Sequence, residues 1–204
     1  MGKIKVMSES LSNKIAAGEV VEKVSSGVKE LVENSIDAGS NLIEVSLVDA
    51  GIKEIKVIDN GKGMDKEDAL LCFSPHATSK IRNENDLFFI NTLGFRGEAL
   101  PSIASVSDVF LETSDGSYST LVHIKGGKLE SNEVGTVSKG TKIIVRDLFF
   151  NTPARLKFLK SYYTELNGVV SLIEKLSLSH PNISFKLSSD NKELIKTSGS
   201  NDLL

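Results

Sequence analysis

The chain has 204 residues, and its 24 Lys and Arg against 27 Asp and Glu give a formal net charge of −3. Hydrophobic residues make up 40% and charged residues 25%, a balance typical of globular proteins and too apolar for a disordered one. The net charge argues against a broadly basic protein that coats nucleic acid, although it leaves room for a local basic patch. The single cysteine excludes an internal disulfide, and the three histidines lie too far apart in sequence to indicate a metal site.

The hydropathy pattern excludes two further classes. No apolar run approaches the roughly 18 residues that span a bilayer, so we expect no membrane association. The N-terminus lacks the apolar segment of a secretory signal, which together with the lone cysteine indicates a reducing, cytoplasmic location. Residues 198–204 are polar, and we expect residues 201–204 to begin a linker after one domain over residues 1–200.

Periodicity along the chain predicts a mixture of helices and hairpins. In chain order, the predicted helices lie near 15–17, 20–37, 66–73, 97–105 and 162–179. The predicted strands lie at Ile4–Val6, 43–47, 55–59, 108–113, 118–125, 128–132, 141–147, 183–188 and 192–197. The stretch 60–98 is rich in Gly, Ser, Thr and Asn, and a loop of that length in a compact domain is usually functional or mobile. The fold class indicated is α+β: a two-layer sandwich of a largely antiparallel mixed sheet with helices on one face.

The helix predicted over 20–37 carries a polar face opposite its apolar stripe. At about 100° per residue, Glu30, Glu33, Asn34 and Asp37 fall within one sector of the helix. A carboxylate there can act as a general base, and an amide oxygen is a hard ligand suited to Mg²⁺. On this motif alone, a solvated helix face is the alternative interpretation.

Two glycine-containing stretches follow in the chain. Asp59 ends a predicted strand and is followed by Asn-Gly-Lys-Gly-Met, so a carboxylate and a close backbone approach are expected at the same place; an ordinary Asn-Gly turn is the alternative. Gly94 and Gly97 precede a predicted helix, with Arg96 between them, an arrangement typical of either an anion site or a helix-entry turn. Neither the dinucleotide-binding nor the P-loop fingerprint occurs, so the Rossmann and P-loop interpretations lose their support.

The order of these motifs is more specific than any one of them. An acid–amide helix, Asp-x-Gly-x-Gly, a glycine-rich loop that enters a helix, and a Gly-Thr strand at Gly140–Thr141 together resemble the GHKL (Bergerat-fold) ATPases. Longer strings resemble the MutL family of DNA mismatch repair proteins, and the resemblance extends from residue 1 to about 200. These strings lie at residues 15–21, 29–35, 59–61, 76–81, 94–100 and 151–155.

The resemblance implies a role for individual residues of an ATP site. Glu30 matches the general base, Asn34 the Mg²⁺ ligand, and Asp59 the acid that accepts the adenine amino group. Gly63 matches the glycine against the base, and Thr141 the hydroxyl near it. A phosphate-covering lid is implied at about 74–97. The other residues implied in ATP binding are Asp37, Met64, Thr78, Ser79, Lys80, Leu93, Gly94, Phe95, Arg96 and Gly97.

The function implied by the resemblance is an ATP-binding, slowly ATP-hydrolysing switch that uses ATP and Mg²⁺. It would couple mismatch recognition by a MutS-type protein to downstream strand processing, with self-association of N-terminal regions on ATP binding and association with the nucleoid. The resemblance also implies a second ATPase subdomain and a C-terminal dimerisation domain that do not fit in this length. Alternative functions are an ATPase domain of another GHKL class (type II topoisomerase or histidine kinase) and a non-enzymatic DNA-binding module.

A cluster of basic residues near the C-terminal third could track DNA phosphates. A solvated strand and helix surface is an equally good interpretation of that cluster, and the net charge of −3 does not favour strong binding. We therefore expect DNA to be bound weakly or through other regions. The candidate DNA contacts are Lys139, Lys142, Arg155, Lys157 and Lys160.

Overall fold

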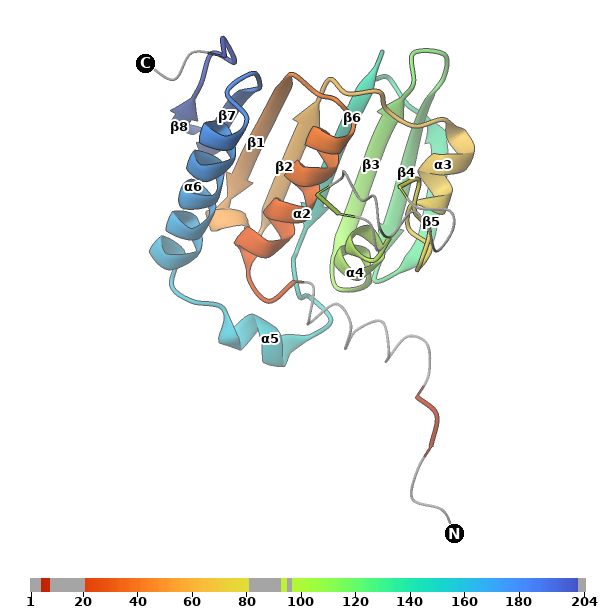
Figure 1. Cartoon of the computed structure of the whole chain (residues 1–204). Coiled ribbons are helices and arrows are strands. Elements are labelled where there is room, and N and C mark those ends of the chain that lie inside the picture. The colour runs from red at the N-terminus through yellow and green to blue at the C-terminus, as the bar shows by residue number, and fades with distance from the viewer. Residues whose placement is uncertain (1–4, 8–20, 81–92, 95–96, 202–204) are drawn as a thin grey trace.

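The computed structural model describes residues 5–7, 21–80, 93–94 and 97–201, and most of residues 21–201 belong to one sheet with helices against it (Figure 1). The helices are α2 (Val24–Asp37), the 3₁₀ turn η1 (Asp49–Gly51), α3 (Lys66–Leu71), α4 (Ala99–Ser105), α5 (Pro153–Phe158) and α6 (Tyr162–Ser179). The strands are β1 (Leu42–Val48), β2 (Glu54–Asp59), β3 (Asp108–Ser114), β4 (Ser119–Lys125), β5 (Lys128–Val134), β6 (Gly140–Arg146), β7 (Ser184–Ser189) and β8 (Lys192–Lys196).

The eight strands form a single mixed sheet in the order β5-β4-β3-β6-β2-β1-β7-β8. Every neighbouring pair is antiparallel except β1 and β7, which run parallel, and α6 leads into β7. The register between β2 and β6 places Asp59 opposite Thr141. Two motifs that are 82 residues apart in sequence therefore meet at one end of the sheet.

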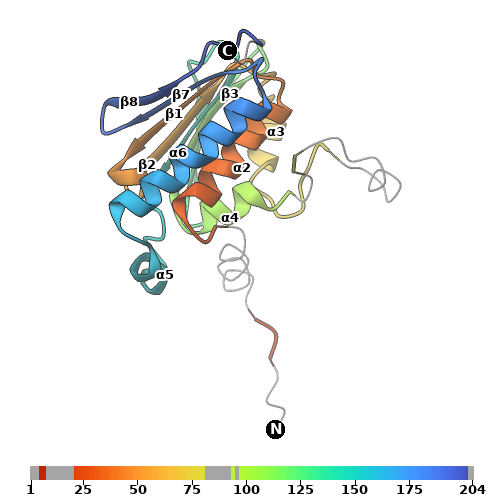
Figure 2. The same cartoon turned by 60° about the vertical axis from the view of Figure 1, so that its left-hand side comes forward.

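Helices cover one face of this sheet and leave the other open, as the two views in Figures 1 and 2 show. Alternate residues of the central strands, such as Val57, Leu111 and Ile143, are buried under α2, α4 and α6. The apolar stripe of α2 (Val24, Val28, Leu31, Val32) is almost fully buried in the same core. The predicted α+β sandwich with helices on one face is thus confirmed.

The structure corrects several boundaries predicted from the sequence. Helix α2 begins at Val24, because Lys23 has an extended backbone with φ −148°. Helix α5 was not predicted: it has six residues and none of them is buried, so no apolar periodicity marks it. Val6 is 99% exposed and Lys5–Met7 form no strand, so the strand predicted there is wrong for the part of the chain that is described. Ile4 and the helix predicted near 15–17 lie outside the described residues.

Among the helices that the structure describes, none combines the length and apolar character needed to cross a membrane.

Candidate functional site

The carboxylate of Asp59 lies at the end of β2, under the C-terminal turn of α2, and is only 8% exposed. Its Oδ2 accepts a hydrogen bond from Ser35 Oγ at 2.8 Å. Its Oδ1 accepts from Ser40 Oγ at 3.1 Å and from the Gly61 amide at 2.8 Å. A carboxylate oxygen can accept two hydrogen bonds, so Oδ2 keeps acceptor capacity beyond the single donor found among the described residues. The acid is therefore held in place and can still accept one more donor.

The glycines around Asp59 are required by the protein's own backbone. Gly63 has φ +66°, and a Cβ there would overlap the carbonyl oxygen of Ser114. Gly140 has φ +102°, and a Cβ there would overlap the carbonyl oxygen of Asp59. The motif predicts that the backbone at Gly63 lets a ligand approach closely. In the structure, the lack of a side chain at Gly63 allows the end of β3 to pack against it.

A second short network fixes the residues beside the acid. Thr141 Oγ1 lies 2.9 Å from Thr113 Oγ1, and the Thr113 hydroxyl also contacts the carbonyl oxygen of Gly140 at 3.0 Å. The amide of Met64 donates to Thr113 Oγ1 at 3.1 Å. Thr113 thus connects two residues that the sequence predicted for the site, Met64 and Thr141, although no motif marked Thr113 itself.

The polar face of α2 divides into residues that are tied down and residues that remain accessible. Glu33 is 8% exposed and receives Lys29 Nζ at 2.7 Å, whereas the same ammonium lies 3.6 Å from Glu30. Burial lowers the pKa of Lys29, but the hydrogen bond and charge of Glu33, with a smaller contribution from Glu30, outweigh it and raise the pKa overall. Glu30 keeps 29% of its side chain exposed, so its carboxylate is open to a water molecule.

Residues 78–80 and 93 lie against the C-terminal turn of α2. Lys80 Nζ contacts Asp37 Oδ2 at 2.6 Å and Asn34 Oδ1 at 3.1 Å. The amide of Leu93 donates to Asp37 Oδ1 at 3.1 Å, and the Lys80 amide donates to Thr78 Oγ1 at 3.2 Å. Five residues predicted for ATP binding are therefore brought together by direct contacts.

Of the other residues predicted for phosphate binding, some lie near the end of α2 and others fall outside the residues that the structure describes. Gly97 has φ +66° and packs on Ala77, whose carbonyl oxygen a Cβ would overlap. Next to it, the Nδ1 atom of His76 lies 2.5 Å from Glu98 Oε1. Gly94 lies beside Lys80, since a Cβ on Gly94 would be 3.7 Å from Lys80 Nζ. Ser79 is exposed, and Phe95 and Arg96 fall outside the described residues.

The donor set fits a magnesium nucleotide in its chemistry. Glu30, Asn34 and Asp37 offer the oxygen atoms that Mg²⁺ prefers, and Lys80 contacts two of these residues, Asn34 and Asp37. No group of three or more His, Cys, Asp or Glu that could hold a metal occurs among the described residues. Mg²⁺ usually binds through one or two protein groups together with substrate phosphates and water.

The basic residues predicted to contact DNA fall into three places. Arg155 and Lys157 lie on α5 and Lys160 just after it; both lysines are exposed, as is Lys139 before β6. Lys142 lies instead on the open face of the sheet, with Nζ 2.8 Å from Glu112 Oε2. Burial raises the pKa of Glu112, but Lys142 and Thr136 outweigh it and lower the pKa to about 2.

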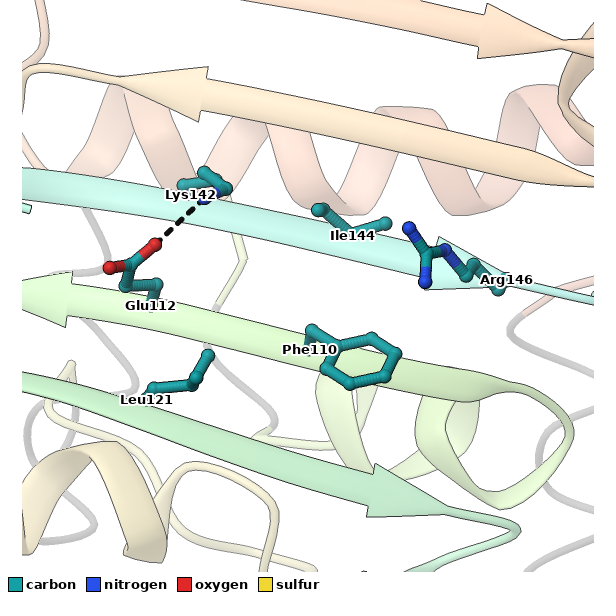
Figure 3. Close-up of a pocket in the computed structure, with 6 residues that line it drawn as sticks. All are labelled: Phe110, Glu112, Leu121, Lys142, Ile144 and Arg146. Carbon is teal, nitrogen blue, oxygen red and sulfur yellow. Dashed lines mark hydrogen bonds and ion pairs between the residues drawn. The ribbon is translucent and has the colours of Figure 1, made fainter. Parts of the chain in front are cut away.

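The open face has a shallow hollow of about 190 Å³ away from Asp59 (Figure 3). It is lined by Phe110, Glu112, Leu121, Lys142, Ile144 and Arg146. These residues alternate along β3, β4 and β6 with buried residues such as Leu111 and Ile143, so they face away from the helices. The hollow and the predicted nucleotide residues therefore lie on opposite faces of the sheet.

Sequence reasoning missed the groups that position the predicted ones. Ser35 lies among the apolar residues of α2 and Ser40 follows the helix; the hydroxyls of both donate to Asp59, although neither residue is predicted for the site from the sequence. A hydroxyl within an otherwise apolar stripe was the available signal for Ser35. Glu165 is 4% exposed and accepts hydrogen bonds from the amides of Val24 and Lys160, so it caps the N-terminus of α2. No local pattern could reveal that contact, because Val24 and Glu165 are 141 residues apart.

A family model described as histidine kinase-, DNA gyrase B- and HSP90-like ATPase matches residues 22–149. The chain belongs to this ATPase family. The match includes α2 with Glu30 and Asn34, Asp59 at the end of β2, and β6 with Thr141. The resemblance to GHKL ATPases that the motifs indicated is therefore confirmed.

Within this ATPase family, the chain is similar to MutL over its whole length. It is 57% identical to the DNA mismatch repair protein MutL of Geobacillus sp. (strain WCH70) over 204 residues, and 55% identical to MutL of Listeria innocua over 198. These alignments cover 100% and 97% of this chain but 33% of each relative, so the chain spans about a third of their length.

Solved structures agree with the sequence comparison. The Aquifex aeolicus MutL ATPase domain complexed with ADP superposes with a TM-score of 0.72 at 33% identity. That alignment covers 89% of this chain and 65% of the Aquifex chain. The resemblance to MutL proposed from the sequence motifs is confirmed at the level of both sequence and fold.

Proposed function

We propose that this chain binds the adenine of ATP at Asp59 and hydrolyses the nucleotide on the neighbouring face of α2. The observation that carries the proposal is the buried Asp59 carboxylate, which three protein donors hold in place while Oδ2 keeps acceptor capacity. An exocyclic amino group such as that of adenine donates to such an acceptor, whereas the carbonyl of guanine cannot. Members of the ATPase family, including the Aquifex domain complexed with ADP, support the choice of nucleotide.

The accessible carboxylate on α2 supplies the base for hydrolysis. Glu30 lies two turns before the helix end, and a general base of this kind positions and deprotonates the attacking water. Asn34, one turn further along, offers its amide oxygen to Mg²⁺, which when bound neutralises charge on the phosphates. Phosphoryl transfer depends mainly on positioning and charge neutralisation, which this arrangement of side chains favours.

The residues brought to the end of α2 are proposed to bind the phosphates. Thr78, Lys80, Gly94 and Gly97 offer a hydroxyl, an ammonium and backbone that can approach an anion closely. Lys80 is already within reach of the metal and phosphate end of the site through Asn34. ATP binding would therefore rearrange contacts that exist between these residues and α2.

Substitution of Glu30 by Ala tests the catalytic assignment. Glu30→Ala should lower ATP turnover by about 100-fold or more, the usual contribution of a general base, while the equilibrium affinity for ATP stays within a few-fold of wild type. The matched control is Glu174→Ala, which removes an exposed glutamate from α6 and should leave both quantities unchanged. Unaltered turnover in Glu30→Ala would contradict the assignment of the base.

At the level of the pathway, we propose an ATP-dependent switch in DNA mismatch repair. The relatives named DNA mismatch repair protein MutL support a role in that pathway. The proposal extends to action downstream of a MutS-type protein, to a place at the nucleoid of a bacterial-type cytoplasm, and to ATP-dependent self-association. The basic residues around α5, namely Arg155, Lys157 and Lys160, are the better candidates for DNA phosphates, and the two lysines are exposed. Lys142 is the weaker candidate, since Glu112 already binds its ammonium.

A further inference from the structure

We propose that Lys80 is an internal counter-cation, which occupies the metal-binding end of the site in the nucleotide-free protein and is displaced when a divalent cation arrives. This inference rests on the proposed function, because it assigns the Asn34–Asp37 end of the site to a metal. It goes further in giving Lys80 a role before nucleotide binds. It makes the free energy of metal binding depend on a residue outside α2.

The contact is direct and largely shielded from water. The Lys80 ammonium lies 2.6 Å from Asp37 Oδ2 and 3.1 Å from Asn34 Oδ1. The side chains of Lys80 and Asp37 are 18% and 9% exposed. A pair at this depth is screened by solvent less than a surface ion pair.

The charge pattern of α2 explains why a cation is needed at this position. Asp37 is the last residue of α2, where the helix dipole is negative, and the last turn of α2 contains no basic residue. A carboxylate is disfavoured at that end of a helix unless a cation lies beside it. Lys80, 43 residues further along the chain, supplies that cation.

The position of the ammonium brings it into competition with a metal ion. Lys80 Nζ already uses the Asn34 amide oxygen, the atom that would bind Mg²⁺ at about 2.1 Å. An ammonium and a divalent cation on the same oxygen would repel each other strongly in a partly buried site. Entry of the metal therefore requires Lys80 to leave, after which its ammonium is free to bind phosphate.

This exchange has a consequence for selectivity. When a metal ion binds alone, the displaced Lys80 ammonium loses its contacts with Asn34 and Asp37 and gains no new anion. When a metal nucleotide binds, the displaced ammonium can pair with the phosphates. The nucleotide-free site should accordingly resist free divalent cations. Because Asp37 also accepts the Leu93 amide at 3.1 Å, the exchange acts on the carboxylate that joins residues 80 and 93 to α2.

Binding of MnCl₂ alone to the nucleotide-free protein, followed by electron paramagnetic resonance, tests the inference. Lys80→Met keeps the length of the side chain but removes its charge, and should bind Mn²⁺ about tenfold more tightly than wild type, equivalent to ~1.4 kcal/mol. Lys66→Met, which removes an exposed lysine from α3, is the control and should match wild type. Equal Mn²⁺ affinity in Lys80→Met and wild type would overturn the inference.

Two further measurements locate the effect and guard against misfolding. The gain should disappear in the double variant Asn34→Ala/Lys80→Met; a gain that persists there would place the metal elsewhere and contradict the inference. Circular dichroism checks the fold, and Lys80→Gln serves if the Met variant does not fold. In the wild type, saturating Mn²⁺ should accelerate acetylation of Lys80 by acetic anhydride, and an unchanged rate would also count against the exchange.

These experiments involve no ATP, so they separate the inference from the proposed function. Tighter Mn²⁺ binding by Lys80→Met in a protein without ATPase activity would support the exchange and contradict the function. Normal ATP turnover by the wild type, together with equal Mn²⁺ affinity in Lys80→Met and wild type, would support the proposed function and contradict the exchange.

Discussion

The two ends of the candidate site differ in what satisfies their charged groups. At the adenine end, Asp59 is held by Ser35, Ser40 and the Gly61 amide, all within the core or the turn that follows β2. At the phosphate end, Asp37 and Asn34 are satisfied by the Lys80 ammonium and, for Asp37, the Leu93 amide, from segments outside the sheet and its covering helices. The first set of contacts can persist when a ligand binds, whereas the second must exchange.

This difference suggests a division of labour in nucleotide binding. A preformed acceptor with fixed geometry discriminates between bases, because little reorganisation accompanies binding. Contacts that must exchange can couple the arrival of phosphate and metal to the position of the segment that carries Lys80. The adenine end should therefore respond to substitution mainly through affinity and stability, and the phosphate end mainly through metal binding and turnover.

The largest expected effect lies in the backbone of the adenine end. Gly63→Ala should lower the free energy of unfolding by about 3–4 kcal/mol, since Ala is strained at positive φ and its Cβ would overlap the Ser114 carbonyl. Gly39→Ala is the matched control: Gly39 also has positive φ, +76°, but nothing lies within 4 Å of a Cβ there. Urea unfolding measures both. Equal losses in the two variants would show that the close approach to β3 is unimportant.

Asp59→Asn should give the next largest effect. The amide keeps the size of the side chain but replaces one acceptor oxygen by a donor among three existing donors. Affinity for ADP should fall about 100-fold, close to 2.7 kcal/mol, as expected for an unsatisfied charged hydrogen bond. Isothermal titration calorimetry measures it, with Asp68→Asn on the exposed side of α3 as the control. Wild-type affinity in Asp59→Asn would contradict the adenine assignment.

The smallest effect is expected on the open face of the sheet. The pKa of Glu112 is lowered from 4.5 to about 2, so its stabilisation is complete above pH 4.5 and is lost as the pH falls toward 2. Relative to Glu112→Gln, the wild type should lose about 1–2 kcal/mol of unfolding free energy over this interval. Glu130→Gln on β5 is the exposed control. Parallel pH profiles of unfolding free energy for wild type and Glu112→Gln would contradict the stabilising role of the ionised Glu112. Reduced ADP affinity in Glu112→Gln would contradict the separation of the open face from the nucleotide site.

Most helices and strands could be predicted because the spacing of apolar residues in the sequence matches the period of each element. The alternation of Ile43, Val45 and Leu47 predicts a strand with one buried face, and all three are buried. The order of strands could not be predicted in the same way, because β6 pairs with β2 and β3 across long sequence distances. Helix α5 escaped prediction because its residues face solvent and leave no apolar stripe.

In the candidate site, too, local motifs could be predicted from the sequence and contacts between distant residues could not. Glu30, Asn34 and Asp59 could be predicted because the order of their motifs resembles that of the GHKL ATPases, whereas each motif alone also fits an ordinary helix face or turn. Ser35 reaches Asp59 across 24 residues, and Lys80 reaches Asp37 across 43. Such contacts follow from packing of α2 against the sheet and the segments after it, which no short sequence window contains.

The central claim is that the preformed acceptor at Asp59 selects adenine. Calorimetric titration of the wild-type protein with the non-hydrolysable analogues of ATP and of GTP, each with Mg²⁺, tests it most directly. We expect the adenine analogue to bind about 100-fold more tightly, because the guanine carbonyl would face the Asp59 carboxylate. Equal affinity for the two analogues, or binding of neither, would contradict the account.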